Sequence, residues 1–273
     1  MRKERVDVLL VSRGLVESRA QAQRLVMAGE VRVDGQVVMK PADRFQETVN
    51  ITIHQKPRFV SRGGEKLEAA LLAFGLENLE GRTCVDVGAS TGGFTDCLLQ
   101  HGAKKVYAVD VGFGELHWKL RSDSRVVAME KTNARFLNGF PEPIDLVVVD
   151  ASFISLKILL PVITTWLQEN GEIVTLIKPQ FEAGRADVSR GEGVIHDPAI
   201  HRRVLLDILE FAVSLNLVIH GLIVSPIKGP KGNTEFLAHL SCSNRKYPLD
   251  YALIDQVSGS QTPFDGVPGD TKG

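Results

Sequence analysis

The sequence predicts an α/β protein in which a small α+β domain precedes a larger domain built on a mostly parallel, seven-stranded sheet. From residue 83 onward, short and almost continuous apolar runs alternate with helical patterns, which is typical of a parallel sheet covered by helices on both faces. The first 60 residues instead combine two short amphipathic segments with an alternating hairpin pattern. A length of 273 residues, with 44% hydrophobic and 24% charged residues, suits one medium and one small globular domain.

The composition also bears on the cellular compartment. The sequence has no run of about 18 apolar residues and no N-terminal signal core, so we expect a cytoplasmic protein with no membrane partner. Three scattered cysteines, Cys84, Cys97 and Cys242, fit thiols in a reducing compartment better than a disulfide framework or a zinc cluster. The histidines show no metal-ligand spacing, so no metal site is expected.

Residues 1–60 are predicted to form the small domain. Apolar residues from Val6 to Val11 indicate one short helix, and Ser18 is a favourable N-cap for a second helix that ends near Gly29. The alternating segment 31–38 turns at Asp-Gly, which predicts a hairpin, and residues 49–53 add a strand. Eleven basic against seven acidic residues make this segment net positive, whereas the remainder is net negative. The excess indicates an anion-binding module or a solvated charged face.

The larger domain is predicted over residues 65–245, after a linker at about 55–64 that carries Pro, paired Gly and basic residues. Helices are expected at 66–74, 95–100 and 197–213. The expected strands are 84–87, 105–110, 125–129, 144–150, 171–177, 217–225 and 236–241. The polar residues 256–273 are predicted to be a disordered tail.

A glycine-rich turn, from Asp86 to Phe94, follows the first strand of the larger domain. Glycine lets the backbone approach a ligand closely, and Asp110, which ends the next strand, can accept hydrogen bonds from ribose hydroxyls. Together they predict a nucleoside-containing cofactor. The turn lacks the dinucleotide spacing of glycines, and Asp86 would repel a pyrophosphate but suits the cationic groups of S-adenosylmethionine (AdoMet), so AdoMet is favoured over NAD. The candidate cofactor-binding residues are Asp86, Gly88, Ser90, Gly92, Gly93, Phe94, Asp110 and Asn133.

Charged residues end the fourth and fifth strands. Asp150 and Lys178 follow strands whose carboxyl ends meet at one edge of the sheet, so their side chains are expected in one crevice. The Asn/Asp-Pro-Pro-aromatic box of base N-methyltransferases is missing after the fourth strand, and no cysteine lies where cytosine C5 enzymes need one. A strand-end lysine that simply meets solvent remains the structural alternative for Lys178.

A set of short motifs spans the small domain. They are Arg5-Val6-Asp7, Arg13-Gly14-Leu15, Ser18-Arg19, Ala22, Gly29, Val31-Arg32-Val33-Asp34-Gly35 and Lys40-Pro41. In order and spacing they resemble the S4 domain, a small RNA-binding module, over nearly all of residues 1–60. The resemblance implies that arginines on a two-helix face grip structured RNA through phosphate and shape contacts. The candidate RNA-binding residues are Arg2, Lys3, Arg5, Arg13, Arg19, Arg24, Lys40, Arg58 and Arg62.

Two further charged residues accompany those at the strand ends: Lys66, in the first helix of the larger domain, and Glu235, before its last strand. With Asp150 and Lys178 they resemble the Lys-Asp-Lys-Glu tetrad of the FtsJ-like ribose 2′-O-methyltransferases. The accompanying motifs are Ser61-Arg62-Gly63-Gly64-x-Lys66-Leu67, Asp86-x-Gly88-x-Ser90-x-Gly92-Gly93-Phe94, Asp150-x-Ser152-Phe153-Ile154-Ser155-Leu156 and Lys178-Pro179-Gln180-Phe181-Glu182. Over residues 1 to about 243, the chain is thus similar to the TlyA/hemolysin A-like family.

This resemblance implies a Rossmann-like, class I methyltransferase domain that uses AdoMet to methylate the ribose 2′-oxygen of a cytidine in ribosomal RNA, with the RNA or ribosomal subunits as partners. Lys178 is the expected base or the group that orients the hydroxyl, Asp150 would hold Lys178, and Glu235 would orient Lys66. Two other functions stay open. One is a non-enzymatic RNA-binding or ribosome-assembly factor that keeps the cofactor fold; the other, ranked last, is a lytic protein.

Overall fold

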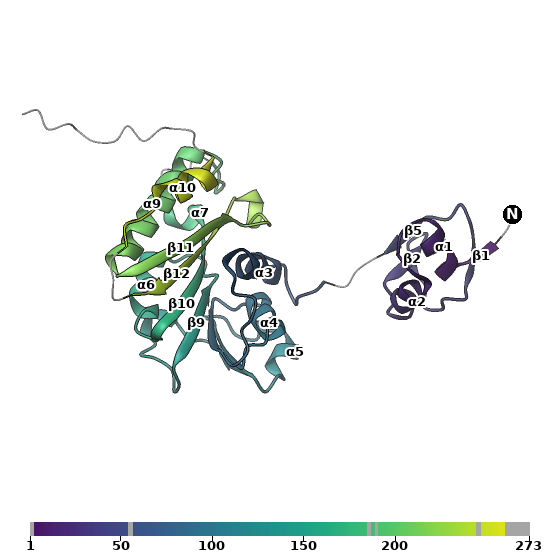
Figure 1. Ribbon diagram of the computed structural model, residues 1–273, viewed down its shortest axis with the longest axis horizontal. Helices are drawn as coiled ribbons and strands as arrows, with labels where there is room; N and C mark the ends of the chain where they lie inside the picture. The colour runs from purple at the N-terminus through teal and green to yellow at the C-terminus, as the bar shows by residue number, and fades with distance from the viewer. Residues whose placement is uncertain (1–2, 54–56, 185–186, 189–190, 244–246, 260–273) are drawn as a thin grey trace, which may run out of the picture. The chain divides into compact units, whose positions relative to one another are not determined.

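The computed structural model describes residues 3–53, 57–184, 187–188, 191–243 and 247–259 (Figure 1). The chain divides into two compact units, residues 1–58 and 59–273. Within the described residues, no helix combines the length and the apolar character needed to cross a membrane.

The first unit packs two helices against short strands. The helices are α1 (Val6–Ser12) and α2 (Arg19–Met27), and the strands are β1 (Lys3–Arg5), β2 (Val31–Val33), β3 (Gln36–Val37), β4 (Arg44–Gln46) and β5 (Ile51–Ile53). Ser18 caps α2 as predicted, since its side chain accepts a hydrogen bond from the Gln21 amide. The hairpin between β2 and β3 turns at Asp34 and Gly35, which both have positive φ, as a two-residue turn of this hand requires. Strands β1 and β4 pair with each other and were not predicted, because three-residue strands leave little pattern.

The second unit contains a seven-stranded sheet in the order β11-β12-β10-β9-β6-β7-β8. Its strands are β6 (Thr83–Val87), β7 (Lys105–Val109), β8 (Val126–Met129), β9 (Ile144–Val149), β10 (Leu167–Ile177), β11 (Leu217–Val224) and β12 (Phe236–Cys242). All neighbouring pairs are parallel except those that β12 forms with β10 and β11. The predicted mostly parallel, seven-stranded sheet is therefore confirmed.

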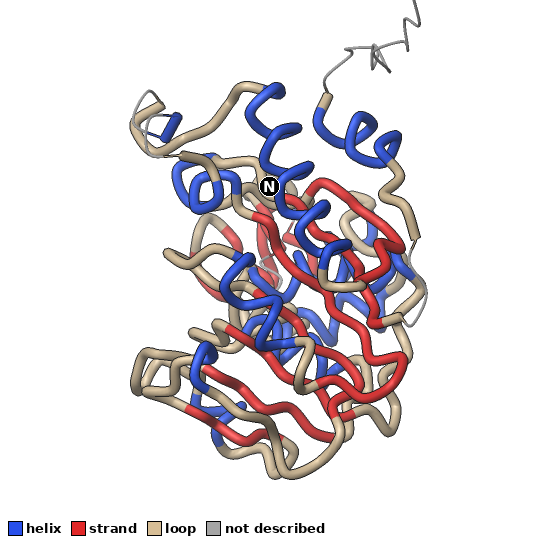
Figure 2. Tube along the Cα trace, turned by 90° about the vertical axis from the view of Figure 1, so that its left-hand side faces the viewer, coloured by secondary structure: helices blue, strands red, loops and turns tan. Residues whose placement is uncertain are grey.

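Helices cover both faces of this sheet (Figures 1 and 2). Helices α3 (Gly63–Phe74), α4 (Gly93–Gln100) and α5 (Trp118–Arg121) pack on one face; α6 (Leu156–Ile163), α9 (Pro198–Ser214) and α10 (Tyr251–Ser258) pack on the other. Successive side chains of β9 point to opposite faces of the sheet. Val147 belongs to the hydrophobic core on one face, and Val148 belongs to the core on the other face. This explains the uninterrupted apolar runs in the sequence, since a strand buried on both faces needs no polar side.

Two segments differ from the predicted boundaries. Helix α3 begins at Gly63, inside the predicted linker. The buried side chain of Phe59 packs against Gly64, so the hydrophobic core of the second unit already includes this part of the predicted linker. Helix α10 extends to Ser258 and so includes the first three residues of the predicted tail, with Ile254 fully buried. Residues 260–273 of that tail lie outside the described residues.

The order of the strands defines where a ligand can enter. From β6 the chain moves outward through β7 to β8, then returns to β9 on the other side of β6. At such a reversal the connections leave in opposite directions, which opens a crevice at the carboxyl ends of the two central strands. Gly88 follows β6 there and Asp150 follows β9.

Candidate active site

Two adjoining cavities open at this crevice, with volumes of about 850 and 630 Å³. They share a wall made by Gly88, Ser90, Asp150, Ser152 and Phe153. The first cavity extends toward α3 and the loop before β12, whereas the second extends toward the end of β7. A bound molecule can therefore reach from one cavity into the other past the shared wall.

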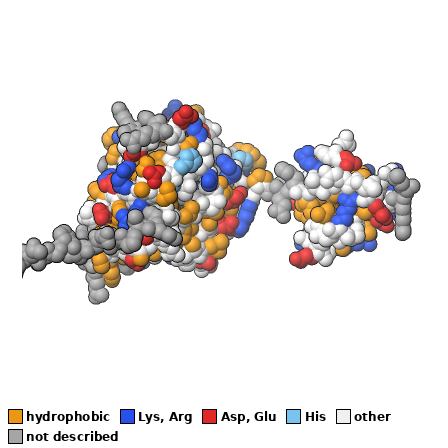
Figure 3. All heavy atoms as spheres, turned by 90° about the horizontal axis from the view of Figure 1, so that it is seen from above, with side chains coloured by type: hydrophobic (Ala, Val, Ile, Leu, Met, Phe, Trp, Pro, Cys, Tyr) orange, Lys and Arg blue, Asp and Glu red, His pale blue; other side chains and the backbone are white. Residues whose placement is uncertain are grey.

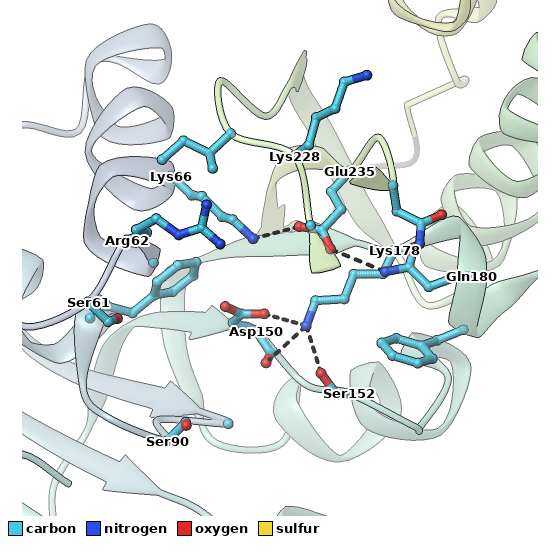
Figure 4. Close-up of a pocket in the computed structure, with 18 of the residues that line it drawn as sticks. Ser61, Arg62, Lys66, Ser90, Asp150, Ser152, Lys178, Gln180, Lys228 and Glu235 are labelled. Carbon is cyan, nitrogen blue, oxygen red and sulfur yellow. Dashed lines mark hydrogen bonds and ion pairs between the residues drawn. The ribbon is translucent and has the colours of Figure 1, made fainter. Parts of the chain in front are cut away.

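The four predicted catalytic residues come together around the first cavity as two ion pairs (Figure 4). The Lys178 Nζ lies 2.5 Å from the Asp150 Oδ1, and the Lys66 Nζ lies 2.6 Å from the Glu235 Oε2. Lys178 also donates a 2.9 Å hydrogen bond to the Ser152 Oγ. The alternative of a strand-end lysine that simply meets solvent is wrong, because Lys178 is 8% exposed.

Burial makes these pairings necessary. Lys66 is 8% exposed and Glu235 only 1%, and an unpaired charge at such depth would carry a large desolvation cost. Burial raises the pKa of Asp150 above its usual value, although the nearby Lys178 and Lys66 ammonium groups oppose the rise. Two positive and two negative groups thus neutralise each other at the wall of one cavity.

Two polar residues complete this region and were not predicted as site residues. Ser152 accepts the hydrogen bond from Lys178, and the Gln180 Nε2 donates a 3.2 Å hydrogen bond to the Glu235 Oε1. Both residues line the first cavity. Their positions inside the motifs that also contain Asp150 and Lys178 were the available signal, but the side chain that each would contact depends on the fold.

The glycine-rich turn, which was predicted to let the backbone approach a ligand, also brings Gly88 close to the end of the neighbouring strand. Gly88 has a φ of +84°, and a Cβ atom there would lie 2.7 Å from the backbone oxygen of Asp150. The close approach that Gly88 permits is therefore to the neighbouring strand end, which keeps Asp150 beside the turn. Asp110 supports the same turn, because its carboxylate accepts 2.7 Å hydrogen bonds from the amides of Ser90 and Gly112.

Six of the eight candidate cofactor residues line a cavity. Gly88 and Ser90 line both, Gly93 and Phe94 line the first, and Asp110 and Asn133 line the second. These last two lie at the end of β7 and before the short helix η1 (Ala134–Phe136). Gly92 lines neither; a Cβ atom there would lie 2.2 Å from Leu120, so its glycine is needed for packing against α5.

Asp86 is the second exception. Its side chain is fully buried within β6 and lines neither cavity. The Thr95 Oγ1 donates a 2.6 Å hydrogen bond to the Asp86 Oδ2, while the Oδ1 has no partner within the described residues. Burial raises the pKa of Asp86 to about 7. Asp86 thus contacts Thr95 rather than a cavity, a direction that the apolar pattern of a strand buried on both faces does not show, and its contact with a cationic ligand stays a prediction.

The predicted RNA-binding residues of the first unit divide into two groups. Arg5 and Arg19 bind the buried carboxylate of Asp7 at 2.9 and 3.0 Å, and Arg13 donates to the carbonyl oxygens of Val49 and Glu47. These contacts hold the fold together, and Arg5 in particular keeps the pKa of Asp7 well below its usual range. Sequence reasoning missed Asp7 because a lone aspartate in a helix reads as a surface residue.

Arg13 and Arg19 are exposed in spite of these contacts. The other candidates that the structure describes are also exposed: Lys3, Arg24, Lys40, Arg58 and, in the second unit, Arg62. Arg62 belongs to the second unit and lines the first cavity (Figure 4). Arg2 lies outside the described residues. On the face shown in Figure 3, lysine and arginine side chains occur on both units among acidic and apolar ones. The described residues contain no cluster of three or more His, Cys, Asp or Glu suited to a metal ion.

Comparison with known proteins identifies both units. The FtsJ-like methyltransferase family model matches residues 59–242, and the S4 domain model matches residues 4–51. The chain is 47% identical to the 16S/23S rRNA (cytidine-2′-O)-methyltransferase TlyA of Mycobacterium tuberculosis, over 94% of this chain and 96% of the relative. It is also 47% identical to hemolysin A of Brachyspira hyodysenteriae, over 86% of this chain and 98% of that protein.

A solved structure gives the same result. A hemolysin candidate from Streptococcus thermophilus is 45% identical and covers 95% of each chain, with a TM-score of 0.72. The two domain matches, the extent of the similarity and the seven-stranded sheet agree with one another. The chain is an enzyme of the FtsJ-like methyltransferase family, in the group of S4-containing proteins that includes TlyA and hemolysin A.

Proposed function

We propose that this protein transfers the methyl group of AdoMet to the ribose 2′-oxygen of a cytidine in ribosomal RNA, and that it acts in the cytoplasm on rRNA, either free or within ribosomal subunits. The observation that carries the proposal is the Lys178–Asp150 pair at the wall shared by two cavities, next to the Lys66–Glu235 pair. One cavity suits a nucleoside cofactor and the other suits the acceptor. The activity by which the M. tuberculosis relative is named supports this choice of substrate.

The second cavity has polar and apolar groups that suit an adenosine group. The Asp110 carboxylate can accept hydrogen bonds from ribose hydroxyls, and Asn133 offers an amide at the same wall. Apolar side chains, including Val109 and Ile154, provide a surface for the base. Gly88 and Ser90 would then contact the methionine end at the shared wall. When bound, AdoMet supplies a methyl group that its sulfonium makes electrophilic.

The first cavity would hold the acceptor ribose against Lys178. The Lys178 Nζ already binds Asp150 and Ser152, so its direction is fixed before substrate arrives. We assign it the role of orienting the 2′-hydroxyl. Because an ammonium cannot accept a proton, the hydroxyl proton would pass to the carboxylate of Asp150 as the new O–C bond forms. Glu235 and Gln180 fix the second ammonium, that of Lys66, at the same cavity. In methyl transfer, the 2′-oxygen must approach the methyl carbon in line with the bond that breaks. Ammonium groups held in fixed positions pre-orient the hydroxyl for this approach and so lower the barrier.

The exposed cations of the first unit and Arg62 at the first cavity suit a polyanionic substrate. S4 domains bind RNA, and we extend that property to Arg24 and Lys40. Since backbone phosphates carry little sequence information, these residues would contribute affinity and orientation, leaving the choice of nucleotide to the cavity.

A labelling experiment tests the proposal. Purified protein, AdoMet carrying a labelled methyl group, and naked rRNA or isolated ribosomal subunits are incubated, and the RNA is then hydrolysed with alkali. A methylated 2′-oxygen cannot attack the adjacent phosphate, so we expect label in an alkali-resistant dinucleotide that contains cytidine. Label in a modified base would overturn the 2′-O assignment. An absence of both label and AdoMet binding would favour an RNA-binding or ribosome-assembly factor instead.

A further inference from the structure

Two motifs that follow adjacent strands run side by side at the shared wall. The first, residues 150–156, links β9 to α6, and the second, residues 178–182, follows β10 and includes the short helix α7 (Pro179–Glu182). They touch at both ends and in the middle. Asp150 pairs with Lys178 at one end, and the rings of Phe153 and Phe181 lie 4.9 Å apart in the middle.

Glu182 closes the other end of this contact. Its Oε2 accepts a 2.6 Å hydrogen bond from the Ser155 Oγ, and its Oε1 accepts a 2.8 Å hydrogen bond from the Leu156 amide. Ser155 is the N-cap of α6, and Leu156 is the first residue of that helix. One carboxylate thus uses both oxygens to hold the helix start, and the positive end of the helix dipole favours a negative group there.

The position of Glu182 argues for more than a surface contact. Its side chain is half-buried, and burial raises its pKa, with Asp207 acting in the same direction, while the Ser155 and Leu156 hydrogen bonds and Lys157 act in the opposite direction. A carboxylate in such a place is retained only where hydrogen bonds compensate the loss of water. Here both hydrogen bonds go to the one segment that also carries Asp150 and Ser152.

The bridged segment also contains backbone strain. Phe153 has a φ of +63°, a conformation that is unfavourable for an aromatic residue, and its side chain is 90% exposed, so little packing holds it. Between Asp150 and Ser155, Ala151 and Ile154 pack against the core, Phe153 contacts the ring of Phe181, and Ser152 accepts a hydrogen bond from Lys178. Without an anchor at its far end, the segment could relax and move Asp150 relative to Lys178.

We propose that Glu182 is a positioning residue that anchors the segment 150–156 and thereby sets the Asp150–Lys178 geometry. The inference rests on the proposed function, in which that pair orients the acceptor hydroxyl. Glu182 does not itself contact the reacting groups, because it lines neither cavity. Its effect on the reaction passes entirely through the segment that it holds.

The variant Glu182→Gln tests this inference, because the amide keeps the shape of the side chain but offers only one acceptor oxygen for two donors. Asp207→Asn is a matched control. Asp207 lies in α9 and pairs with Lys157, the second residue of α6, but among the described residues it makes no contact with the segment 150–155. Full-length wild type and both variants are compared by methyl transfer at saturating AdoMet and rRNA, by AdoMet affinity and by thermal unfolding.

We expect Glu182→Gln to lower kcat about tenfold or more, since a displacement of about 1 Å in catalytic groups can cost up to about 100-fold. Its KM for rRNA and its AdoMet affinity should stay within about twofold of wild type, and Asp207→Asn should keep the wild-type kcat. A wild-type kcat in Glu182→Gln overturns the inference, as does an equal loss in both variants, which would indicate a general effect on α6.

Amide hydrogen exchange makes the test independent of activity. If Glu182 anchors the segment, exchange in residues 150–158 should accelerate in Glu182→Gln and not in Asp207→Asn. Unchanged exchange there overturns the inference. If the wild type fails to methylate RNA but exchange is still accelerated in Glu182→Gln, the result would contradict the proposed function and leave the anchor in place.

Discussion

Three aspartates near the crevice show that surroundings, rather than residue type, decide what a carboxylate does. Asp110 accepts two backbone hydrogen bonds at a cavity wall, Asp150 pairs with Lys178, and Asp86 is buried with one oxygen that finds no partner in the described part of the chain. The sequence predicted where Asp110 and Asp150 lie, because both end strands at a known edge of the sheet. It did not predict the burial of Asp86, whose side-chain direction depends on how α4 packs on β6.

Substituting Asp86 with Asn has an effect that depends on pH. The pKa of Asp86 is raised from 3.8 to about 7, so the folded state holds its proton more tightly than the unfolded state does. The stability contributed by this residue is therefore complete below about pH 4 and is lost as the pH rises to 7. Asparagine stays neutral throughout and avoids that loss.

We therefore predict that Asp86→Asn has nearly wild-type stability at pH 4 and exceeds it at pH 8, by an amount on the order of 4 kcal/mol if the whole shift is realised. Chemical denaturation of both proteins at several pH values measures this difference. A constant difference in the free energy of unfolding across that range would show that Asp86 ionises normally.

At the scale of elements, the contact between α3 and α4 positions Lys66. Gly93, the first residue of α4, lies against the start of α3, where a Cβ atom would come within 2.9 Å of the Gly64 amide nitrogen. The sequence predicted the strands within one to four residues, since their apolar runs are long. It missed α6, whose pattern contains Pro161, and α10, in which few residues are buried.

We predict that Gly93→Ala lowers the stability of the protein by about 1–3 kcal/mol, because the backbone of Gly64 has little freedom to move away. The control is Gly184→Ala, where no atom lies within 4 Å of the added Cβ and φ is ordinary. Thermal unfolding should show a decrease of several degrees for Gly93→Ala and little change for the control. Equal melting temperatures for the two variants would mean that α3 can move away from α4 without lowering the stability of the protein.

At the scale of the whole molecule, the chain has two units with different tasks. Sequence motifs predicted both, because the small domain and the methyltransferase domain each carry several short motifs in order. The sequence did not show which arginines of the first unit bind groups of the domain itself. That distinction depends on Asp7, whose burial brings Arg5 and Arg19 together.

The double variant Arg24→Ala/Lys40→Ala should weaken RNA binding without changing the chemistry. Both residues are exposed, so their removal leaves the core of the first unit intact. We expect a higher KM for rRNA, a shallower dependence of RNA affinity on salt, and unchanged kcat and AdoMet affinity. By contrast, Arg13→Ala should also lower the melting temperature, because Arg13 binds two carbonyl groups. An unchanged KM in the double variant would exclude these residues from the RNA interface.

In the proposed function, methyl transfer depends on the Lys178–Asp150 pair. The most direct measurement is the single-turnover rate of methyl transfer to rRNA by wild type, Lys178→Ala and Lys178→Arg, with AdoMet affinity and thermal unfolding measured in parallel. Lys178→Arg keeps a positive charge beside Asp150, so a lower rate in this variant cannot be attributed to unfolding caused by an unpaired Asp150. We predict that both variants bind AdoMet but transfer methyl at least 100-fold more slowly. Wild-type rates in folded Lys178 variants would contradict the account and move the chemistry to another residue of the crevice.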